Sequence, residues 1–432
     1  MALDYITPLG EETGQRMLSA LQGIAAEQAK LVLLKEQELN STLTTIADWN
    51  EVATLIGEGI VHDVFPVGSV VSTAWADPRS AVDTNWSYGM RMAGLETINT
   101  RGHTGVPCMT LHSKLALPFA TAFDDYEGFY AVPAAGLAAG TYSVAFGNTS
   151  AWGQVPANAV VSFTLEQAYT EGALLRFSGS VYSTAPASLN VCAFADLAAI
   201  KSRTATETAA CSSGAAEGAT SLGTIPATVA DYSASGQLNH LHRVGLGSNR
   251  WATSALRQYL NSSAAAGAWW EPQSKWDYPP AYLATTAGHL SGFSADFVEH
   301  LAQREVKTAL PYCDGGTSGG TECDTTYDRV WLPSAEQLCW NPTWLGVPLG
   351  LEGAALPYWR EVWGSDAPAT MGQVHTEFCM AGMGAETTMR GVFERSAYRS
   401  YGGNVACCYA GGTLYGNYAS YGGCCAPAYS II

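Results

Sequence analysis

The N-terminal part of the chain carries apolar residues at helical spacing. In residues 10–47 the apolar positions recur every three to five residues, which predicts an amphipathic helix. Because this helix precedes the globular part, its apolar stripe needs a partner, either sister chains or the body of the protein. A second helix is expected to begin at Asp48, which with Glu51 resembles a capping box, and to end near Gly59. The stripe consists of Met17, Leu21, Ile24, Leu31, Leu34 and Leu39.

From Phe65 onwards the apolar period changes to two, which is typical of strands. Residues 65–75 and 104–117 are rich in β-branched and apolar residues and predict two strands, with a loop rich in Asp, Arg and Asn between them. Residues 60–115 are therefore expected to form the first part of a domain.

A separate β-rich unit is expected at residues 116–225. Five short segments with strand-like composition follow one another there, separated by Gly, Pro, Ala and Asn, as in a small β-sandwich. Residues 204–230 are a low-complexity stretch that we interpret as a linker or long loop. The five expected strands lie within residues 128–133, 140–147, 159–165, 173–183 and 188–195.

Helices and irregular segments return in residues 226–432. Residues 249–263 predict a helix capped by Thr253 or Ser254, and residues 294–310 form another amphipathic segment. Towards the C-terminus, pairs of glycines divide the chain into short runs that predict turns between irregular strands. These pairs are Gly402 with Gly403, Gly411 with Gly412, and Gly422 with Gly423.

Composition and charge narrow the class of protein. The 432 residues suggest several structural units, and with 47% hydrophobic and 14% charged residues the chain is typical of a globular protein. A formal net charge of -17 with no basic cluster argues against nucleic acid and anionic membranes as partners. No run of about twenty apolar residues predicts a membrane span. The first residues lack a basic and an apolar region, so we expect no conventional export signal.

Motifs for catalysis or metal binding are sparse. The eleven cysteines are odd in number and form no zinc knuckle, which favours reduced, packed thiols. His240 and His242 have the spacing of ligands on one strand face, but no third ligand lies nearby in sequence, so a structural role is favoured. The sequence holds no nucleophile elbow, zincin or phosphate-loop spacing and no calcium-loop pattern. We therefore expect no enzymatic activity.

The C-terminal segment has an unusual composition. From Arg395 to Ile432 there is no Lys, Glu, Gln, Met or Trp, and after Arg399 there is no charged side chain. Tyr, Ser, Gly and Asn dominate antibody paratopes, because Tyr supplies rigid amphipathic area while Ser and Gly adapt. The segment is thus expected to form an uncharged contact surface; the alternative is an irregular sheet buried in the core, although so many glycines would pack a core poorly.

Several stretches resemble one known family. "FERSAYRSYGGNVACCYAGGTLYGNYASYGGCCAPAYSI" is similar to the C-terminal variable region of proteins diversified by retroelements, which have a C-type-lectin-like fold related to formylglycine-generating enzymes. "ADWNEVATLIGEGIVHDVFPVGS" resembles the opening segment of such proteins from phages of gut bacteria. "GSNRWATSALRQYLNS" resembles part of their central region, and "DRVWLPSAEQL" resembles the strand and helix that precede their variable region. The likeness covers nearly everything after residue 45.

The resemblance implies an origin for the five missing amino acids. In this family adenines of a template are rewritten, and an Asn codon so treated can become Tyr, Ser, Gly, Ala or Cys, but never Lys, Glu, Gln, Met or Trp. A diversified surface within about residues 395–424 is therefore implied, interleaved with a scaffold. The implied scaffold residues are Arg395, Ser396, Val405, Leu414, Pro427 and Ala428. The implied ligand-binding residues are Tyr398, Ser400, Tyr401, Gly402, Gly403, Ala406, Cys408, Tyr409, Ala410, Tyr415, Gly416, Tyr418, Ser420, Tyr421, Gly422 and Gly423.

The chain departs from sugar-binding and catalytic relatives of this fold. Calcium-dependent lectins use EPN or QPD together with WND, whereas this chain has "EPQ" at Glu271 and "WNP" at Trp340, so calcium-dependent sugar binding is not expected. Catalytic relatives bind copper through two cysteines. Since randomisation also yields Cys, we attribute Cys408 and Cys424 to that process and expect no metal or cofactor. The copper alternative concerns Cys407, Cys408, Cys424 and Cys425.

The expected architecture is α+β. A C-type-lectin-like domain formed by residues 60–115 and 226–432 is interrupted by a β-sandwich at 116–225 and preceded by a helical oligomerisation segment at 1–59. The resemblance implies a homotrimeric receptor-binding protein of a phage tail tip that binds a bacterial surface protein or glycan alongside other virion tail proteins. The alternatives are a bacterial cell-surface location, a copper-dependent oxidase of the formylglycine-generating type, and a structural virion protein whose C-terminal segment is a subunit interface.

Overall fold

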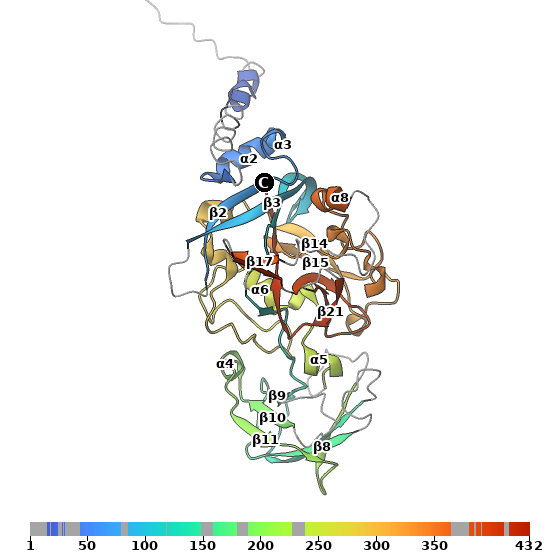
Figure 1. Ribbon diagram of the computed structural model, residues 1–432. Helices are drawn as coiled ribbons and strands as arrows, with labels where there is room; N and C mark the ends of the chain where they lie inside the picture. Colours follow the sequence, from blue (N-terminus) through green and yellow to red (C-terminus); the bar gives the residue numbers. More distant parts are fainter. Residues whose placement is uncertain are drawn as a thin grey trace, which may run out of the picture.

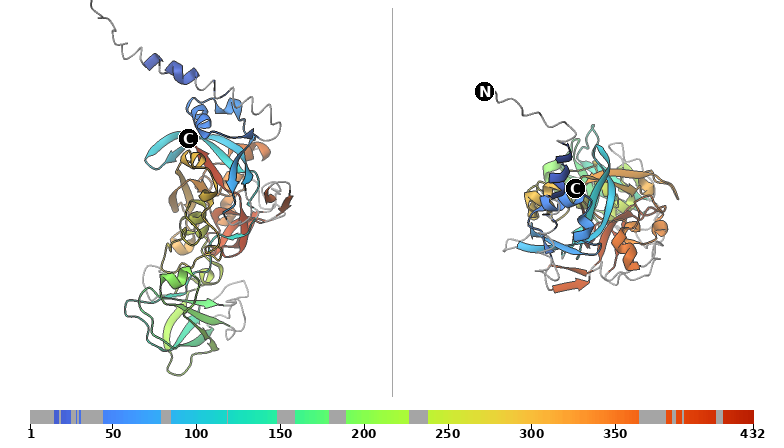
Figure 2. Two further views of the ribbon diagram at one scale, coloured as in Figure 1. Left: turned by 90° about the vertical axis from the view of Figure 1, so that its left-hand side faces the viewer. Right: turned by 90° about the horizontal axis from the view of Figure 1, so that it is seen from above.

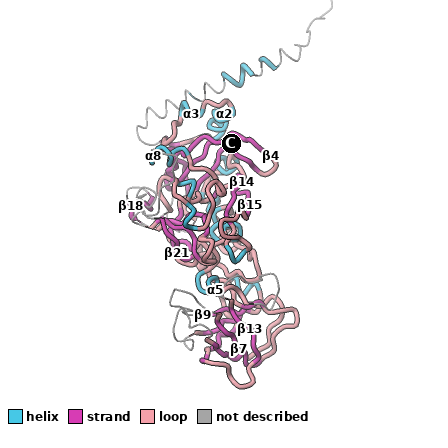
Figure 3. Tube along the Cα trace, turned by 90° about the vertical axis from the view of Figure 1, so that its right-hand side faces the viewer, coloured by secondary structure: helices cyan, strands magenta, loops and turns pink. Residues whose placement is uncertain are grey.

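The computed structural model shows a mixed α and β chain in which sheets predominate and helices are few. An N-terminal helical segment projects from one end of a central body, and a smaller β-unit lies at the opposite end (Figure 1 and Figure 2). The elements are connected by many loops, as the tube view shows (Figure 3). The described residues are 15–17, 19–24, 28, 30, 44–78, 85–117, 119–147, 159–178, 189–226, 238–363, 380–383, 386–389, 391–409 and 414–432.

The N-terminal segment is helical at residues 15–17, 19–24, 28 and 30. Met17, Leu21 and Ile24 of the predicted stripe are exposed there, and Leu31, Leu34 and Leu39 lie outside the described residues. The predicted helix does not reach residue 47. Thr44–Thr45 instead form a short strand, β1, which pairs in parallel with β2.

Helix α2 (Trp49–Gly57) begins after Asp48, whose carboxylate accepts a hydrogen bond from the Asn50 backbone N–H, so the predicted helix start is confirmed. This helix packs into the core of the body, although we assigned it to the N-terminal segment. The body therefore begins before residue 60, and α3 (Val61–Val64) follows directly. The buried side chains of α2 are Trp49, Val52, Leu55 and Ile56.

The main sheet of the body has eight strands and combines both ends of the chain. Strand β23 lies between β4 and β16, so the segment before the inserted unit and the C-terminus share one sheet. Strands β2 and β4 match the prediction, whereas β3 occupies the region that we expected to be a loop. The strands are β1, β2 (Val70–Ala76), β3 (Asn85–Thr100), β4 (His103–Ser113), β14 (Arg304–Ala309), β15 (Cys323–Asp328), β16 (Val330–Trp331) and β23 (Ala428–Ile431).

Short helices cover this sheet. Ser254 caps α6 (Ala255–Leu260) by accepting a hydrogen bond from the Arg257 backbone N–H, as the sequence predicted. The amphipathic segment 294–310 is helical only near its start, because it contains both α7 (Ala295–Glu299) and strand β14. The other helices of the body are η2 (Trp251–Thr253), η3 (His289–Gly292), η4 (Tyr312–Asp314), η5 (Glu336–Leu338), η6 (Pro342–Leu345) and α8 (Pro357–Trp363).

The C-terminal segment forms a second sheet of five strands in the order β21-β20-β19-β22-β5. Gly422 and Gly423 lie within β22 rather than in a turn, and the pair at 411 and 412 lies outside the described residues. A two-stranded sheet, β17 (Met380–Met383) and β18 (Glu386–Met389), precedes it. The strands of the five-stranded sheet are β19 (Val392–Ala397), β20 (Asn404–Cys408), β21 (Leu414–Tyr418), β22 (Gly422–Cys425) and β5 (Thr121–Ala122).

The inserted unit consists of two four-stranded sheets that share a core of their own. All five predicted strands are confirmed. Residues 204–230, which the sequence predicts to be a linker or long loop, contain three further strands. Because β5 pairs with β22, residues before about 128 belong to the body. The sheets are β11 (Glu207–Ala210), β10 (Asn190–Phe194), β9 (Leu174–Ser178) and β6 (Tyr130–Ala131), and β12 (Ser212–Ser213), β8 (Val160–Leu165), β7 (Gly140–Phe146) and β13 (Thr220–Ile225), with α4 (Leu197–Lys201) beside them and α5 (Leu241–Leu246) at the junction.

Candidate ligand-binding surface

Aromatic side chains of the C-terminal segment make ring contacts with one another around strands β20 and β21 of the second sheet. The rings of Tyr409 and Tyr415 lie 5.7 Å apart, and Trp344 lies 6.4 Å from Tyr415 and 5.5 Å from Tyr398. Tyr409, Tyr415 and Tyr421 are 39%, 41% and 54% exposed, so this cluster is open to solvent. We call it the tyrosine surface, and it comprises Trp344, Tyr398, Tyr401, Tyr409, Tyr415, Tyr418 and Tyr421.

Two turns of the same kind place four of these rings. The backbone N–H of Tyr401 donates to the carbonyl of Tyr398, and that of Tyr421 donates to the carbonyl of Tyr418. Each turn brings two tyrosines three residues apart into edge-to-face contact, at 4.8 Å for the first pair and 5.0 Å for the second. The repeated geometry arises from the spacing Tyr-x-x-Tyr in the sequence.

The buried side chain of Asn249 holds the backbone of the first turn, at residues 398–404. Its side-chain amide donates to the carbonyls of Tyr398, Tyr401 and Asn404 at 3.1, 2.8 and 2.8 Å, and its backbone N–H donates to the carbonyl of Gly402. The Asn249 side chain is fully buried. One scaffold residue 150 positions earlier in the chain thus satisfies most of the backbone of this turn, which leaves the tyrosine side chains free to vary.

The two arginines near the surface point away from it. Arg399 is fully buried and donates to the carbonyls of Leu310, Gly320 and Gly346 and to Glu322. Arg395 is also buried and donates to the carbonyl of Leu332, and burial lowers its pKa to about 10. Their charge therefore organises the scaffold and is not presented to a ligand.

Partial burial favours the neutral form of three phenols of the tyrosine surface. The pKa values of Tyr398, Tyr409 and Tyr418 are raised, first because partial burial disfavours the phenolate and then because neighbouring tyrosines would repel it. The phenols consequently remain hydrogen-bond donors. Such a surface can offer ring faces and hydroxyl groups, but no ionic contact.

Sequence reasoning missed two aromatic members of this region. Trp344 belongs to η6, far upstream of the segment we expected to bind ligand, and its indole N–H is buried with no partner among the described residues. His242 in α5 lies 5.8 Å from the Tyr401 ring, and burial lowers its pKa, which keeps it neutral. Neither residue carries a sequence signal that links it to the C-terminus. In the described part of the chain, no group of three His, Cys, Asp or Glu residues could hold a metal ion.

Several implied ligand-binding positions are buried in this structure, so they present no side chain on its surface. A Cβ atom at Gly403 would lie 2.6 Å from the Leu246 Cβ, and one at Gly423 would lie 2.5 Å from the Phe393 ring, so neither position accepts a side chain without a backbone shift. Ser400 and Gly422 are exposed, Ser420 is half-buried, and Ala410 lies outside the described residues. The buried positions are Gly402, Gly403, Ala406, Cys408, Gly416 and Gly423. The implied scaffold residues Arg395, Ser396, Val405, Leu414, Pro427 and Ala428 are all buried.

The cysteines of the second sheet flank its central strand. Cys408 on β20 and Cys424 on β22 both pair with Val392, from opposite sides, and Cys407 and Cys425 pair with Phe393 in the same way. Their Cα atoms are therefore about 10 Å apart, twice the strand spacing. The arrangement is that of packed thiols in neighbouring strands and does not favour a two-cysteine copper site.

Comparison with known proteins gives one similarity. Residues 229–424 match a family described as a domain of unknown function, DUF6273, and this match spans Asn249 and all of the tyrosine surface. No curated protein and no solved structure matches the chain. Among the described helices, none combines the length and the apolar character that crossing a membrane requires.

Proposed function

We propose that the protein is a ligand-binding display protein whose C-terminal surface is diversified by a retroelement. The observation that carries this proposal is the tyrosine surface, in which Tyr409, Tyr415 and Tyr421 are exposed, while the buried Asn249 holds the backbone of the neighbouring turn at residues 398–404. A buried scaffold that does not depend on the exposed side chains is what a variable surface requires. The missing Lys, Glu, Gln, Met and Trp of residues 395–432 support the same origin.

The proposed fold is C-type-lectin-like, with the inserted unit as a β-sandwich. The proposed location is a phage tail tip, where the protein would bind a bacterial surface protein or glycan beside other virion tail proteins. Self-association as a homotrimer is supported by the exposed Met17, Leu21 and Ile24 on the projecting helix, because apolar side chains at this spacing share one helix face.

The test is binding to host cells by variants of the tyrosine surface. Replacing Tyr409, Tyr415 and Tyr421 together by Ala removes the three exposed rings of the tyrosine surface, so we expect binding to whole cells and stripped envelopes to fall at least tenfold. The melting temperature should stay within a few degrees. Leu197→Ala, at an exposed apolar residue of the inserted unit, is the control and should bind normally.

The outcome also separates the proposal from a structural virion role. If the triple variant binds cells as well as the unmodified protein but fails to assemble into particles, the tyrosine surface is a subunit interface. Sequencing the locus in related genomes is an independent check, since a template repeat with changes confined to adenines is expected only from diversification.

A further inference from the structure

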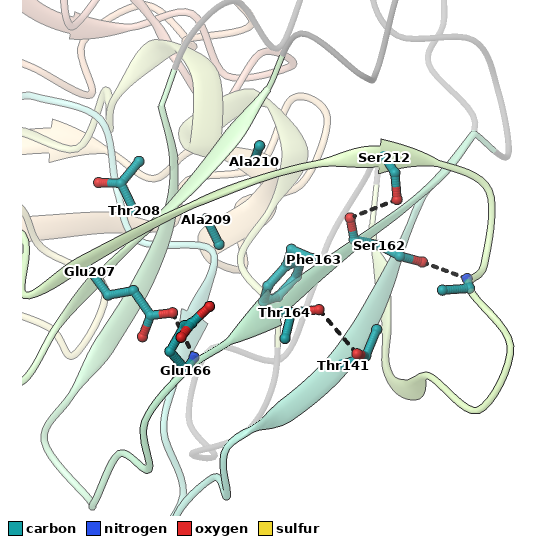
Figure 4. A pocket seen from close by; sticks show the side chains of 11 residues that line it. Thr141, Ser162, Phe163, Thr164, Glu166, Glu207, Thr208, Ala209, Ala210 and Ser212 are labelled. Atoms are coloured by element: carbon teal, nitrogen blue, oxygen red, sulfur yellow. Dashed lines mark hydrogen bonds between the residues drawn. The ribbon is translucent and has the colours of Figure 1, made fainter.

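The inserted unit has a groove where its two sheets separate. Strand β8 of one sheet and strand β11 of the other lie on either side of a cavity of about 460 Å³ (Figure 4). Chain segment β11–β12 passes from one sheet to the other at the closed end, where Ser212 pairs with Ser162. We call this the sandwich groove, and it is lined by Thr141, Ser162, Thr164, Glu166, Glu207, Thr208 and Ala210 among others.

One wall of the groove is an open strand edge. The Phe146 N–H donates to the Ala159 carbonyl, and in an antiparallel pair every second residue from there on bonds to the partner strand. The backbone groups of Ser162 and Thr164 fall on the other positions of β8 and therefore point away from β7. Ser162 pairs with β12, but Thr164, the next such residue, has no backbone partner on this side among the described residues. Strand pairing thus stops halfway along β8.

The opposite wall is open in the same way. The Cys211 N–H donates to the Leu189 carbonyl, which sets the alternation on β11 so that Thr208 and Ala210 direct their backbone groups away from β10. Thr208 and Ala210 are exposed. In the register of β12, Ala210 would be opposite Thr164, but the two strands have separated there and do not pair.

The side chains of the groove are largely satisfied by one another. Thr141 and Thr164 share a hydrogen bond of 3.0 Å, and Ser162 donates to the Gly214 carbonyl. The Glu207 carboxylate accepts from the Glu166 backbone N–H at 2.7 Å (Figure 4). The unmet hydrogen-bonding groups are therefore backbone N–H and C=O groups, which favours a polypeptide over a sugar as the occupant.

The charge of the lining residues indicates which kind of polypeptide the sandwich groove favours. The lining residues include two carboxylates, Glu166 and Glu207, and no Lys, Arg or His. Glu166 is exposed, so its carboxylate is accessible from the open end of the groove. A partner with a cationic side chain at this end gains a charge-assisted contact, whereas an acidic partner is repelled.

We propose that the sandwich groove binds an extended segment of a partner protein, which adds as a strand to β8 at Thr164 and places a Lys or Arg beside Glu166. Backbone hydrogen bonds at Thr164 would supply affinity, and the carboxylate would supply selectivity. This site is independent of the tyrosine surface, which lies in another sheet and another part of the molecule (Figure 1).

The test is selection of peptides on the full-length protein with a display library of random eight-residue peptides. Proline-free sequences with at least one Lys or Arg should be enriched, and a synthetic copy of the strongest should bind in calorimetry. Thr164→Pro removes the backbone N–H that points into the groove. It leaves the hydrogen bonds between β7 and β8 in place, and it should weaken peptide binding at least tenfold. Thr164→Val keeps that N–H and is the matched control, expected to bind within about twofold, while Glu166→Gln should weaken binding severalfold.

A second readout keeps the test valid if the proline variant fails to fold. Peptides methylated on alternate backbone nitrogens cannot form the added strand and should lose binding to the unmodified protein. The proposal is overturned if no peptide is enriched, or if the peptides bind the Thr164→Pro protein and the methylated form normally. It is also overturned if the unmodified protein self-associates through this edge, shown by oligomers in sedimentation that Thr164→Pro removes.

Discussion

At the scale of single residues, Asn249 determines whether the first tyrosine turn is ordered. Asn249→Ala removes the three side-chain hydrogen bonds that Asn249 donates to carbonyls of this turn, although each carbonyl keeps a backbone donor, and we expect a loss of about 1–3 kcal/mol in the free energy of unfolding. Urea unfolding followed by tryptophan fluorescence measures this loss. Asn417→Ala is a suitable control, because Asn417 is half-buried in the same sheet and its side chain bonds only to the next backbone N–H. Equal losses in the two variants would contradict the assigned role.

The sequence predicted the exposed tyrosines but not the residues that hold them. Tyr409, Tyr415 and Tyr421 could be inferred because the composition of the segment is itself the signal. Asn249 and Trp344 could not, because their roles depend on contacts across 50 to 150 positions of the chain, and a lone Asn or Trp has no local pattern. Local composition identifies a surface, whereas its support is a property of the tertiary fold.

At the scale of elements, the turn between β19 and β20 rests on α5. Gly403→Ala would place a methyl group 2.6 Å from the Leu246 Cβ and 3.1 Å from two carbonyl oxygens, so we expect a destabilisation of about 1–3 kcal/mol. Ser400→Ala in the same turn is exposed and should change the free energy of unfolding by less than about 0.5 kcal/mol. Thermal unfolding of the two variants tests this difference, and a neutral Gly403→Ala would restore position 403 to the set of variable residues.

Elements with regular patterns were predicted and those with atypical composition were missed. Strand β3 buries Tyr88, Met90 and Met92 on alternate positions, but its Gly and Asn residues have low strand propensity and the region appeared loop-like. Residues 204–230 are rich in Ala, Gly, Thr and Ser, and their strands are mostly exposed, so hydrophobic alternation gave no signal. Pairing with neighbouring strands, rather than intrinsic preference, stabilises both.

At the scale of the whole molecule, a cluster of buried carboxylates lies where the body meets the inserted unit. Burial raises the pKa of Asp277 to about 7, with Glu127 as the next cause, and burial also raises the pKa of Asp124 and Glu127. Arg243 pairs with Asp314 and also lies 4.0 Å from the Glu127 carboxylate. The pKa of Asp277 is higher in the folded protein than in the unfolded chain, so the protonated carboxyl stabilises the folded state. This contribution of Asp277 is present at low pH and is lost as the pH rises through about 7.

The protein should therefore be more stable in mild acid. Between pH 5 and pH 8 we expect the free energy of unfolding to fall by about 1–3 kcal/mol on account of Asp277, and Asp277→Asn should reduce this dependence. Glu217→Gln, in an exposed turn, should leave it unchanged. Urea midpoints at the two pH values measure the effect. A midpoint that rises with pH in the unmodified protein would refute a buried protonated cluster.

The exposed apolar residues of the N-terminal helix lead to a prediction about the oligomeric state of the protein. Met17, Leu21 and Ile24 are 51%, 60% and 56% exposed on one helix face, and sister chains that cover this face in the proposed trimer would remove it from water. Light scattering should report a trimer at micromolar concentration, and Leu21→Asp with Ile24→Asp should yield a monomer. Ser19→Asp, on another face of the same helix, should remain trimeric. If each tyrosine surface binds weakly, the monomer should lose cell binding by about 10²- to 10⁴-fold while its single-site affinity is unchanged. A monomeric unmodified protein would contradict the assembly, and it would then have to bind its ligand through one surface alone.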